Sequence, residues 1–176
     1  MFRNFVIRDV TILLATAGLW ATTVRLGVDT TLGTIVAVSA GVGAAICAYN
    51  FHEWGHLVAA RVTDSVYTPA QRVLSPFLFA YDEKQNTKRQ FIIMSLGGFA
   101  ATAVYVLVFW LGMPQELLAS RVALRGALIL ASLTVIFEFP IFFRALLGST
   151  VPRTGVFTGP TVGGEKRATA TDDRKS

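Results

Sequence analysis

The chain has 176 residues, of which 53% are hydrophobic and 15% are charged, and its formal net charge is +5. Soluble domains usually carry about a quarter charged residues, so this composition excludes an ordinary soluble globular protein. The positive charge is accounted for by membrane topology and by contact with anionic lipid, and no nucleic-acid partner is expected. We therefore predict an all-α integral membrane protein embedded in a lipid bilayer.

Four apolar stretches follow one another along the chain, at residues 10–24, 32–60, 91–112 and 122–147. A helix needs about 20 apolar residues to cross a bilayer, and each stretch is predicted to form a transmembrane helix. The first stretch is short enough to be compared with a signal peptide. Its small residues lie inside the apolar run, however, which favours an uncleaved helix. The four helices together predict a membrane domain over residues 1–147.

The orientation of these helices follows from the positions of Lys and Arg. With four spans both termini lie on one side of the membrane, together with the loop at residues 62–90. That side carries all of the 16 Lys and Arg residues except Arg25, Arg121 and Arg125. Basic residues concentrate on the cytoplasmic side of membrane proteins. The sequence therefore predicts a multi-pass protein of the cell membrane with cytoplasmic N- and C-termini.

The second predicted helix contains the only two histidines of the chain, in the segment 52–56 with the sequence HEWGH. On a helix, this H-E-x-x-H spacing places both imidazoles on one face, about 40° apart, where they can bind one metal ion. Glu53 is then placed to accept a proton from water that the metal activates. Ionisable residues inside membrane helices are costly and mark functional sites. The alternative is a pair of helix-end histidines that share hydrogen bonds, with Glu53 solvated among the lipid headgroups.

Two residues that precede this motif are given structural interpretations. Asn50 is polar and close to the motif, and a hydrogen bond to another helix is favoured over a contact with substrate. Cys47 lies off the face shared by the two histidines and is interpreted as a small packing residue. Because it is the only cysteine of the chain, an intramolecular disulfide is excluded.

The segments outside the spans are short. Residues 62–90 are predicted to form a cytosolic loop with a short β-hairpin. Within it, the alternating residues 73–79 (VLSPFLF) favour an edge strand or hairpin, and residues 82–89 predict a polar turn. From Gly148 onward Gly, Thr, Pro and charged residues dominate, so residues 148–176 are predicted to be a disordered cytosolic tail.

Glu138 is the one acidic residue of the last apolar stretch, at a depth expected to match that of the two histidines. Pro140 removes a helical hydrogen bond close by, so we expect a kinked or unwound backbone there. Catalytic zinc normally has three protein ligands plus water. We therefore predict a Zn²⁺ site formed by His52, His56 and Glu138. The alternative is that Glu138 forms an ion pair with Arg144 near the membrane surface.

The segment 52–61 (HEWGHLVAAR) resembles the zinc helix of the site-2 protease family of intramembrane metalloproteases. Residues 91–99 (FIIMSLGGF) are similar to the helix that follows it in that family, and the Pro-containing last span is similar to the helix that brings the third ligand. The resemblance covers residues 32–147, about two-thirds of the chain. It implies that the last three helices form a protease-like core.

The resemblance implies a zinc-dependent intramembrane endopeptidase that cleaves a transmembrane or membrane-associated protein near the cytosolic face. The chain departs from the family in two places. Gly98 and Phe99 replace an expected Gly-Pro pair, and no Leu-Asp-Gly follows Pro140, so the aspartate ligand of the family has no counterpart. The alternative is a non-catalytic relative that binds or regulates a membrane partner. A haem protein is disfavoured, because two histidines four residues apart on one helix cannot bind opposite faces of one iron.

Overall fold

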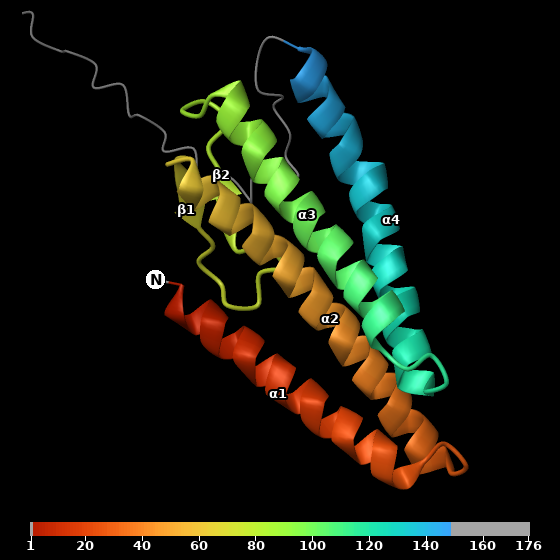
Figure 1. Ribbon diagram of the computed structural model, residues 1–176. Coiled ribbons are helices and arrows are strands. Elements are labelled where there is room, and N and C mark those ends of the chain that lie inside the picture. Colours follow the sequence, from red (N-terminus) through yellow and green to blue (C-terminus); the bar gives the residue numbers. More distant parts are fainter. Residues whose placement is uncertain (1, 149–176) are drawn as a thin grey trace, which may run out of the picture.

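The computed structural model describes residues 2–148. It contains the helices α1 (Arg3–Leu26), α2 (Thr31–Val62), α3 (Lys88–Gly112) and α4 (Leu118–Leu147), and the strands β1 (Tyr67–Pro69) and β2 (Phe79–Tyr81) (Figure 1). All four helices are long and apolar enough to cross a membrane, which confirms that part of the predicted fold. The predicted disordered tail, apart from Gly148, lies outside the described residues.

Helix α2 occupies the middle of the molecule. It contacts α1, α3 and α4, and α3 and α4 also contact each other, whereas α1 packs mainly against α2 (Figure 1). Helix α1 begins at Arg3 rather than at residue 10, because the charged segment before the first apolar stretch continues the same helix. The three helices α2, α3 and α4 thus form one compact group, and α1 lies along its side.

Small residues let these helices approach closely. Gly55 of α2 faces Gly97 of α3, and a Cβ atom added to either would lie only 2.5 Å from the carbonyl oxygen of the other. Gly41 of α2 meets Ala119 and Val122 of α4 in the same way, with a Cβ atom 2.7 Å from the Ala119 carbonyl oxygen. Close packing of this kind is a main source of helix association in membranes. The contact at Gly55 holds α3 against the α2 segment that carries the HEWGH motif, and the contact at Gly41 holds α4 against the first half of α2.

Helix ends are capped by local hydrogen bonds. The Thr30 side chain accepts a hydrogen bond from the Gly33 amide at the start of α2. Thr87 and Gln90 form a reciprocal capping box at the start of α3. Lys88 donates from Nζ to the carbonyl oxygens of Leu146 and Gly148, both at 2.8 Å, and so caps the end of α4. The ends of α3 and α4 that lie beside the hairpin are therefore joined to each other.

The loop between α2 and α3 contains a short antiparallel hairpin. Tyr67 pairs with Tyr81 and Pro69 with Phe79, so most of the predicted strand at residues 73–79 belongs to the connection between the strands. Pro76 lies in this connection, and the carbonyl oxygens of Val73 and Ser75 accept hydrogen bonds from Arg8 of α1 instead of from a strand. The hairpin packs on the ends of α2 and α3 through a buried cluster that includes Leu57, Leu78, Phe79, Tyr81, Phe91 and Met94.

The turn that leads from β2 to α3 is organised by Asp82. Its Oδ1 accepts hydrogen bonds from the backbone amides of Lys84 at 2.9 Å and Gln85 at 3.0 Å. Burial opposes ionisation of Asp82, but a hydrogen bond from the Gln85 side chain to Oδ2 at 2.6 Å and the two backbone hydrogen bonds outweigh burial and hold the pKa of its carboxyl below the usual value. Asn86 then bridges the turn to β1 through two hydrogen bonds with the Val66 backbone. The predicted polar turn is present, and it fixes where α3 begins.

Candidate metal centre

Three side chains from two helices converge between α2 and α4. The Nε2 atoms of His52 and His56 are 3.0 Å apart. Glu138 Oε1 lies 3.2 Å from His52 Nε2, and Glu138 Oε2 lies 3.3 Å from His56 Nε2. Among the described residues Glu138 pairs with the two histidines and not with Arg144. The structure therefore brings together the three residues that the sequence predicts as ligands, in an arrangement that can hold a metal ion.

Hydrogen bonds from α3 set the protonation of both imidazoles. His56 Nδ1 lies 2.9 Å from the Met94 carbonyl oxygen, and His52 Nδ1 lies 3.1 Å from the Gly98 carbonyl oxygen and 2.8 Å from Thr102 Oγ1. A carbonyl oxygen can only accept a hydrogen bond, so each Nδ1 must carry a proton. A neutral ring then presents its Nε2 lone pair toward Glu138. Histidine ligands of metal ions are usually held in this way.

This arrangement fits a bound cation. Two nitrogen lone pairs and a carboxylate face one another in a buried space, and they repel one another unless a positive charge lies between them. Glu138 Oε2 is buried and, among the described residues, its contact with His56 Nε2 at 3.3 Å does not have the geometry of a hydrogen bond. Tetrahedral zinc with bonds of about 2.0–2.1 Å spaces its ligand atoms about 3.3–3.4 Å apart. The observed separations of 3.0, 3.2 and 3.3 Å need to expand only by a few tenths of an ångström at most.

Helix α3 also shapes the space for the imidazoles. A Cβ atom at Gly98 would collide with the His56 ring, so glycine is required there for the ring to occupy its position. Phe99 stands where the resemblance leads one to expect proline. It packs against Phe139 and Phe142 of α4, with ring centroids 4.7 and 5.3 Å away. The departure from the Gly-Pro pair therefore supplies a contact between α3 and the turn of α4 that carries Glu138.

Of the two backbone forms expected near Glu138, kinked or unwound, the unwound form is wrong. Helix α4 runs from Leu118 to Leu147 through Pro140, so it is not unwound at the proline. Membrane helices tolerate proline where neighbouring groups compensate for the lost hydrogen bond. Glu138 is consequently presented by a regular helix, and the packing of α4 on α2 and α3 directs it to the histidines.

Glu53 lies beside the three converging residues without being one of them. Its side chain is buried, and Oε2 accepts a hydrogen bond from the Leu78 backbone amide at 3.4 Å. It is also close enough to interact electrostatically with His52, His56 and Glu138. Leu78, the residue before β2, therefore covers the Glu53 carboxylate from the hairpin side. A buried carboxylate next to a metal-ligand set, but outside it, is placed to act as a general base.

Tyr49 is a further member of the site that the sequence analysis did not identify. Its ring stacks on that of His52, with centroids 6.4 Å apart and an interplanar angle of 26°. Its hydroxyl donates a hydrogen bond to the Glu53 carboxylate. The signal in the sequence was the spacing, because residues three and four positions apart share a helix face. Thr102 was also missed, since only the packing of α3 on α2 brings it to His52.

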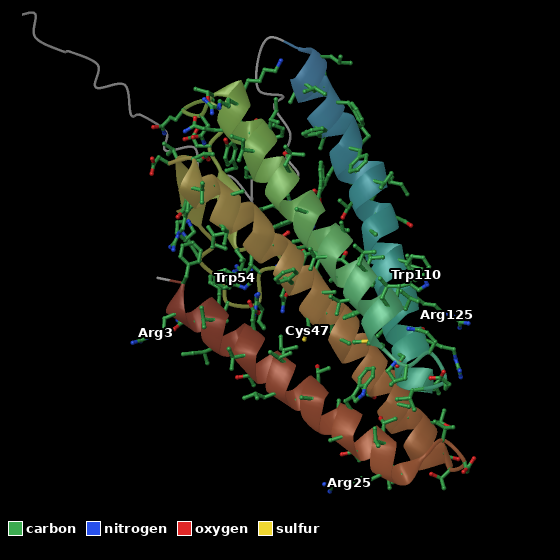
Figure 2. The ribbon with its side chains drawn as sticks, in the orientation of Figure 1. Arg3, Arg25, Cys47, Trp54, Trp110 and Arg125 are labelled. Carbon is green, nitrogen blue, oxygen red and sulfur yellow. The ribbon has the colours of Figure 1, made fainter. Side chains whose placement is uncertain are left out.

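The two residues that precede the motif face α1 instead. Asn50 donates to Asp9 Oδ1 at 3.0 Å, which is the helix-to-helix hydrogen bond favoured from the sequence over a substrate contact. Trp54 donates from Nε1 to Asp9 Oδ2 at 2.7 Å. Cys47 also points toward α1, where its Sγ lies 3.9 Å from Thr16 Oγ1 (Figure 2). These contacts attach α1 to the face of α2 that does not carry the metal ligands.

No family model matches the chain, and neither a curated protein nor a solved structure matches it. What the fold and the site define is a chain with four helices long enough to span a membrane and a buried group of two histidines and one glutamate that can hold a metal ion. The functional argument therefore rests on the geometry of its own residues.

Proposed function

We propose that this protein is a zinc-dependent intramembrane endopeptidase. The observation that carries the proposal is the convergence of His52 Nε2, His56 Nε2 and the Glu138 carboxylate, with the other nitrogen of each ring held by α3. Two histidines and one glutamate are a ligand set of known zinc proteases, and they leave the fourth position open for water. Glu138 takes the place of the aspartate that the site-2 protease resemblance leads one to expect.

Each residue of the site has a role in peptide hydrolysis. Zinc, when bound, supplies a Lewis acid and lowers the pKa of its water to about 7. Glu53 accepts a proton from the water as the water oxygen attacks the carbonyl carbon of the peptide bond. It returns this proton to the amine nitrogen as the carbon–nitrogen bond breaks. The Met94 and Gly98 carbonyls and Thr102 keep the two imidazoles in their orientation and tautomer.

The position of the site along α2 supports a cleavage point near one membrane face. His56 lies six residues before Val62, the last residue of α2, which corresponds to about 9 Å along the helix axis. The hairpin side of the molecule is the side richer in Lys and Arg, which favours a cytoplasmic hairpin and cytoplasmic termini. The substrate is then a transmembrane or membrane-associated protein. Its helix must unwind to expose a peptide bond, and the hairpin offers strand edges to hold the unwound segment.

The first prediction concerns Glu53. Because Glu53 handles the proton and does not bind the metal, Glu53→Gln should abolish cleavage and leave one zinc per chain. The measurements are the zinc content of detergent-purified protein and the cleavage of a fluorescent transmembrane peptide. Glu83→Gln in the surface turn is the control, and it should cleave at the wild-type rate.

Three outcomes separate the alternatives. Cleavage by Glu53→Gln at the wild-type rate would contradict the role of Glu53. A wild-type protein that binds zinc but cleaves no helical substrate would favour the non-catalytic relative that binds or regulates a membrane partner. A wild-type protein that binds no zinc would contradict the metal centre itself.

A further inference from the structure

A groove of about 500 Å³ lies between α2 and α4. Along α2 it runs through residues 42, 45, 46 and 49, and His52 follows one turn later. Along α4 it ends at Leu130, eight residues before Glu138. Tyr49 is therefore the groove residue that lies nearest to the ligands along α2. The remaining walls are apolar except for Arg125, and consist of Val42, Ala45, Ile46, Val122, Gly126, Ile129 and Leu130.

Tyr49 belongs to the groove and to the metal centre at once. Its side chain is half-buried, its ring packs on His52, and its hydroxyl reaches the Glu53 carboxylate. Glu53 is thus contacted from two directions, by Leu78 on the hairpin side and by Tyr49 on the groove side. A peptide that approaches Glu53 and the ligands along the groove passes the Tyr49 side chain.

We propose that Tyr49 is a further catalytic residue, whose hydroxyl donates a hydrogen bond to the carbonyl oxygen of the peptide bond being cleaved. This inference rests on the proposed function and adds to it a residue that contacts the substrate. When water attacks the carbonyl carbon, the electron pair of the C=O bond moves to oxygen, which becomes negatively charged. A donor that is already in place stabilises this charge without reorganisation.

The hydrogen bond between Tyr49 and Glu53 explains when the hydroxyl becomes available to the substrate oxygen. In the resting site the hydroxyl is hydrogen-bonded to the Glu53 carboxyl group. Once Glu53 has accepted the proton of the attacking water, its carboxyl group is neutral and a weaker acceptor. The hydroxyl of Tyr49 can then donate to the oxygen that has gained charge. Tyr49 keeps its own proton throughout, so the step adds no proton transfer.

Other donors near the site are directed elsewhere. The amide of Asn50 donates to Asp9 on the side of α1. The backbone amide of Leu78 donates to Glu53 Oε2. Thr102 Oγ1 is held at His52 Nδ1, on the opposite side of the ring from the converging Nε2 atoms. Among the described residues that line the groove, Tyr49 is the donor that also contacts the base.

The second prediction is that Tyr49→Phe should lower kcat for a transmembrane peptide by about 100-fold or more, as removal of a donor to an oxyanion does in other hydrolases. KM, zinc content and the melting temperature should stay close to wild type, since the ring remains. Thr22→Val is the control, because it also removes a hydroxyl, and the Thr22 hydroxyl donates to the Gly18 carbonyl oxygen within α1, away from the ligands and the groove. It should retain wild-type kcat.

Binding of a phosphonate peptide supplies a readout that does not depend on turnover. The phosphonate group imitates the tetrahedral intermediate and its negatively charged oxygen. The affinity of the phosphonate peptide for the zinc-loaded protein should therefore fall at least about 10-fold in Tyr49→Phe. The affinity for an uncleaved peptide of the same sequence should not change. The phosphonate and the uncleaved peptide are both measured by calorimetry in micelles.

The outcomes distinguish this inference from the proposed function. Equal cleavage by wild type and Tyr49→Phe, or equal phosphonate affinity, would refute the role of Tyr49 and leave the protease proposal intact. Loss of zinc in Tyr49→Phe would show that Tyr49 only supports the ligands, and would also refute it. A wild-type protein without cleavage activity would overturn the protease proposal and the role of Tyr49 together.

Discussion

The imidazole rings of His52 and His56 show how two ordinary backbone carbonyls can prepare a metal site. Each ring donates a hydrogen bond from Nδ1 to a carbonyl oxygen of α3. Its Nε2 lone pair then faces the other ring and Glu138. Without a cation, at least one buried group must take up a proton or remain unpaired, and an unpaired buried polar group costs about 1–3 kcal/mol. The arrangement is therefore better suited to a bound ion than to a packed core.

The third prediction concerns Glu138. Glu138→Ala leaves only two ligands, so it should weaken zinc binding by at least about 10-fold, the lower end of the effect seen even for groups that merely support ligands. Zinc retained during dialysis against a chelator measures this. Glu83→Ala, in the surface turn, should retain as much zinc as wild type. Equal retention by the two variants would show that Glu138 is not a ligand.

Contacts between whole helices depend on a few small residues and one charged residue. Gly55, inside the HEWGH motif, allows the backbones of α2 and α3 to touch, and Gly98 leaves room for His56. On the other face of α2, Asp9 of α1 accepts hydrogen bonds from Asn50 and Trp54 and pairs with Arg8. These contacts at one carboxylate fix the position of α1 on α2.

The fourth prediction tests the contact between α2 and α3. Gly55→Ala places a Cβ atom 2.5 Å from the Gly97 carbonyl oxygen, and the two backbones must separate. Overpacking of this kind costs about 1–3 kcal/mol, so the melting temperature in detergent should fall. Gly18→Ala in α1 is the matched control because a Cβ atom there meets nothing within 4 Å. Equal melting temperatures for the two variants would mean that α2 and α3 do not touch at Gly55.

At the scale of the whole molecule, charge and architecture are consistent with each other. The hairpin, the beginning of α1 and the ends of α2 and α4 carry the greater number of basic residues, while Arg25 lies at the opposite end of α1 from Arg3 (Figure 2). The hairpin packs on the ends of α2 and α3 and supplies Leu78 to Glu53, so the candidate site is near that end. The orientation in the membrane therefore decides from which compartment the site is reached.

The fifth prediction concerns this orientation. In a Cys47→Ser background, Asp29→Cys between α1 and α2 should react with a membrane-impermeant maleimide added to intact cells. Lys84→Cys, in the exposed turn before α3, should react only after the cells are permeabilised. Gel shifts after labelling measure both. The reverse pattern would place the hairpin and the candidate site on the outer side.

Local properties of the chain were sufficient for several features. Hydropathy alone predicts four long apolar helices, because the free energy of transferring a helix into lipid is a sum over the side chains of that one segment. The spacing of His52 and His56 places them on one helix face, because helix periodicity is itself local. The depth of Glu138 followed from counting residues along two such helices. That zinc binds there, and that a peptide is cleaved, stay predictions.

Other features depend on which segments of the chain meet in space. The sequence could not show that carbonyl oxygens of α3 hold both imidazoles. It also could not show that Asn50 contacts Asp9 while Tyr49 contacts Glu53. Nor could it show that Arg8 binds the carbonyl oxygens of Val73 and Ser75, which lie in the predicted strand. These contacts join residues from separate elements or opposite faces of α2. The glycine contacts set the spacing of the helices and therefore which residues meet. Periodicity and hydropathy describe one segment at a time, so tertiary packing alone determined the surroundings of the candidate metal centre.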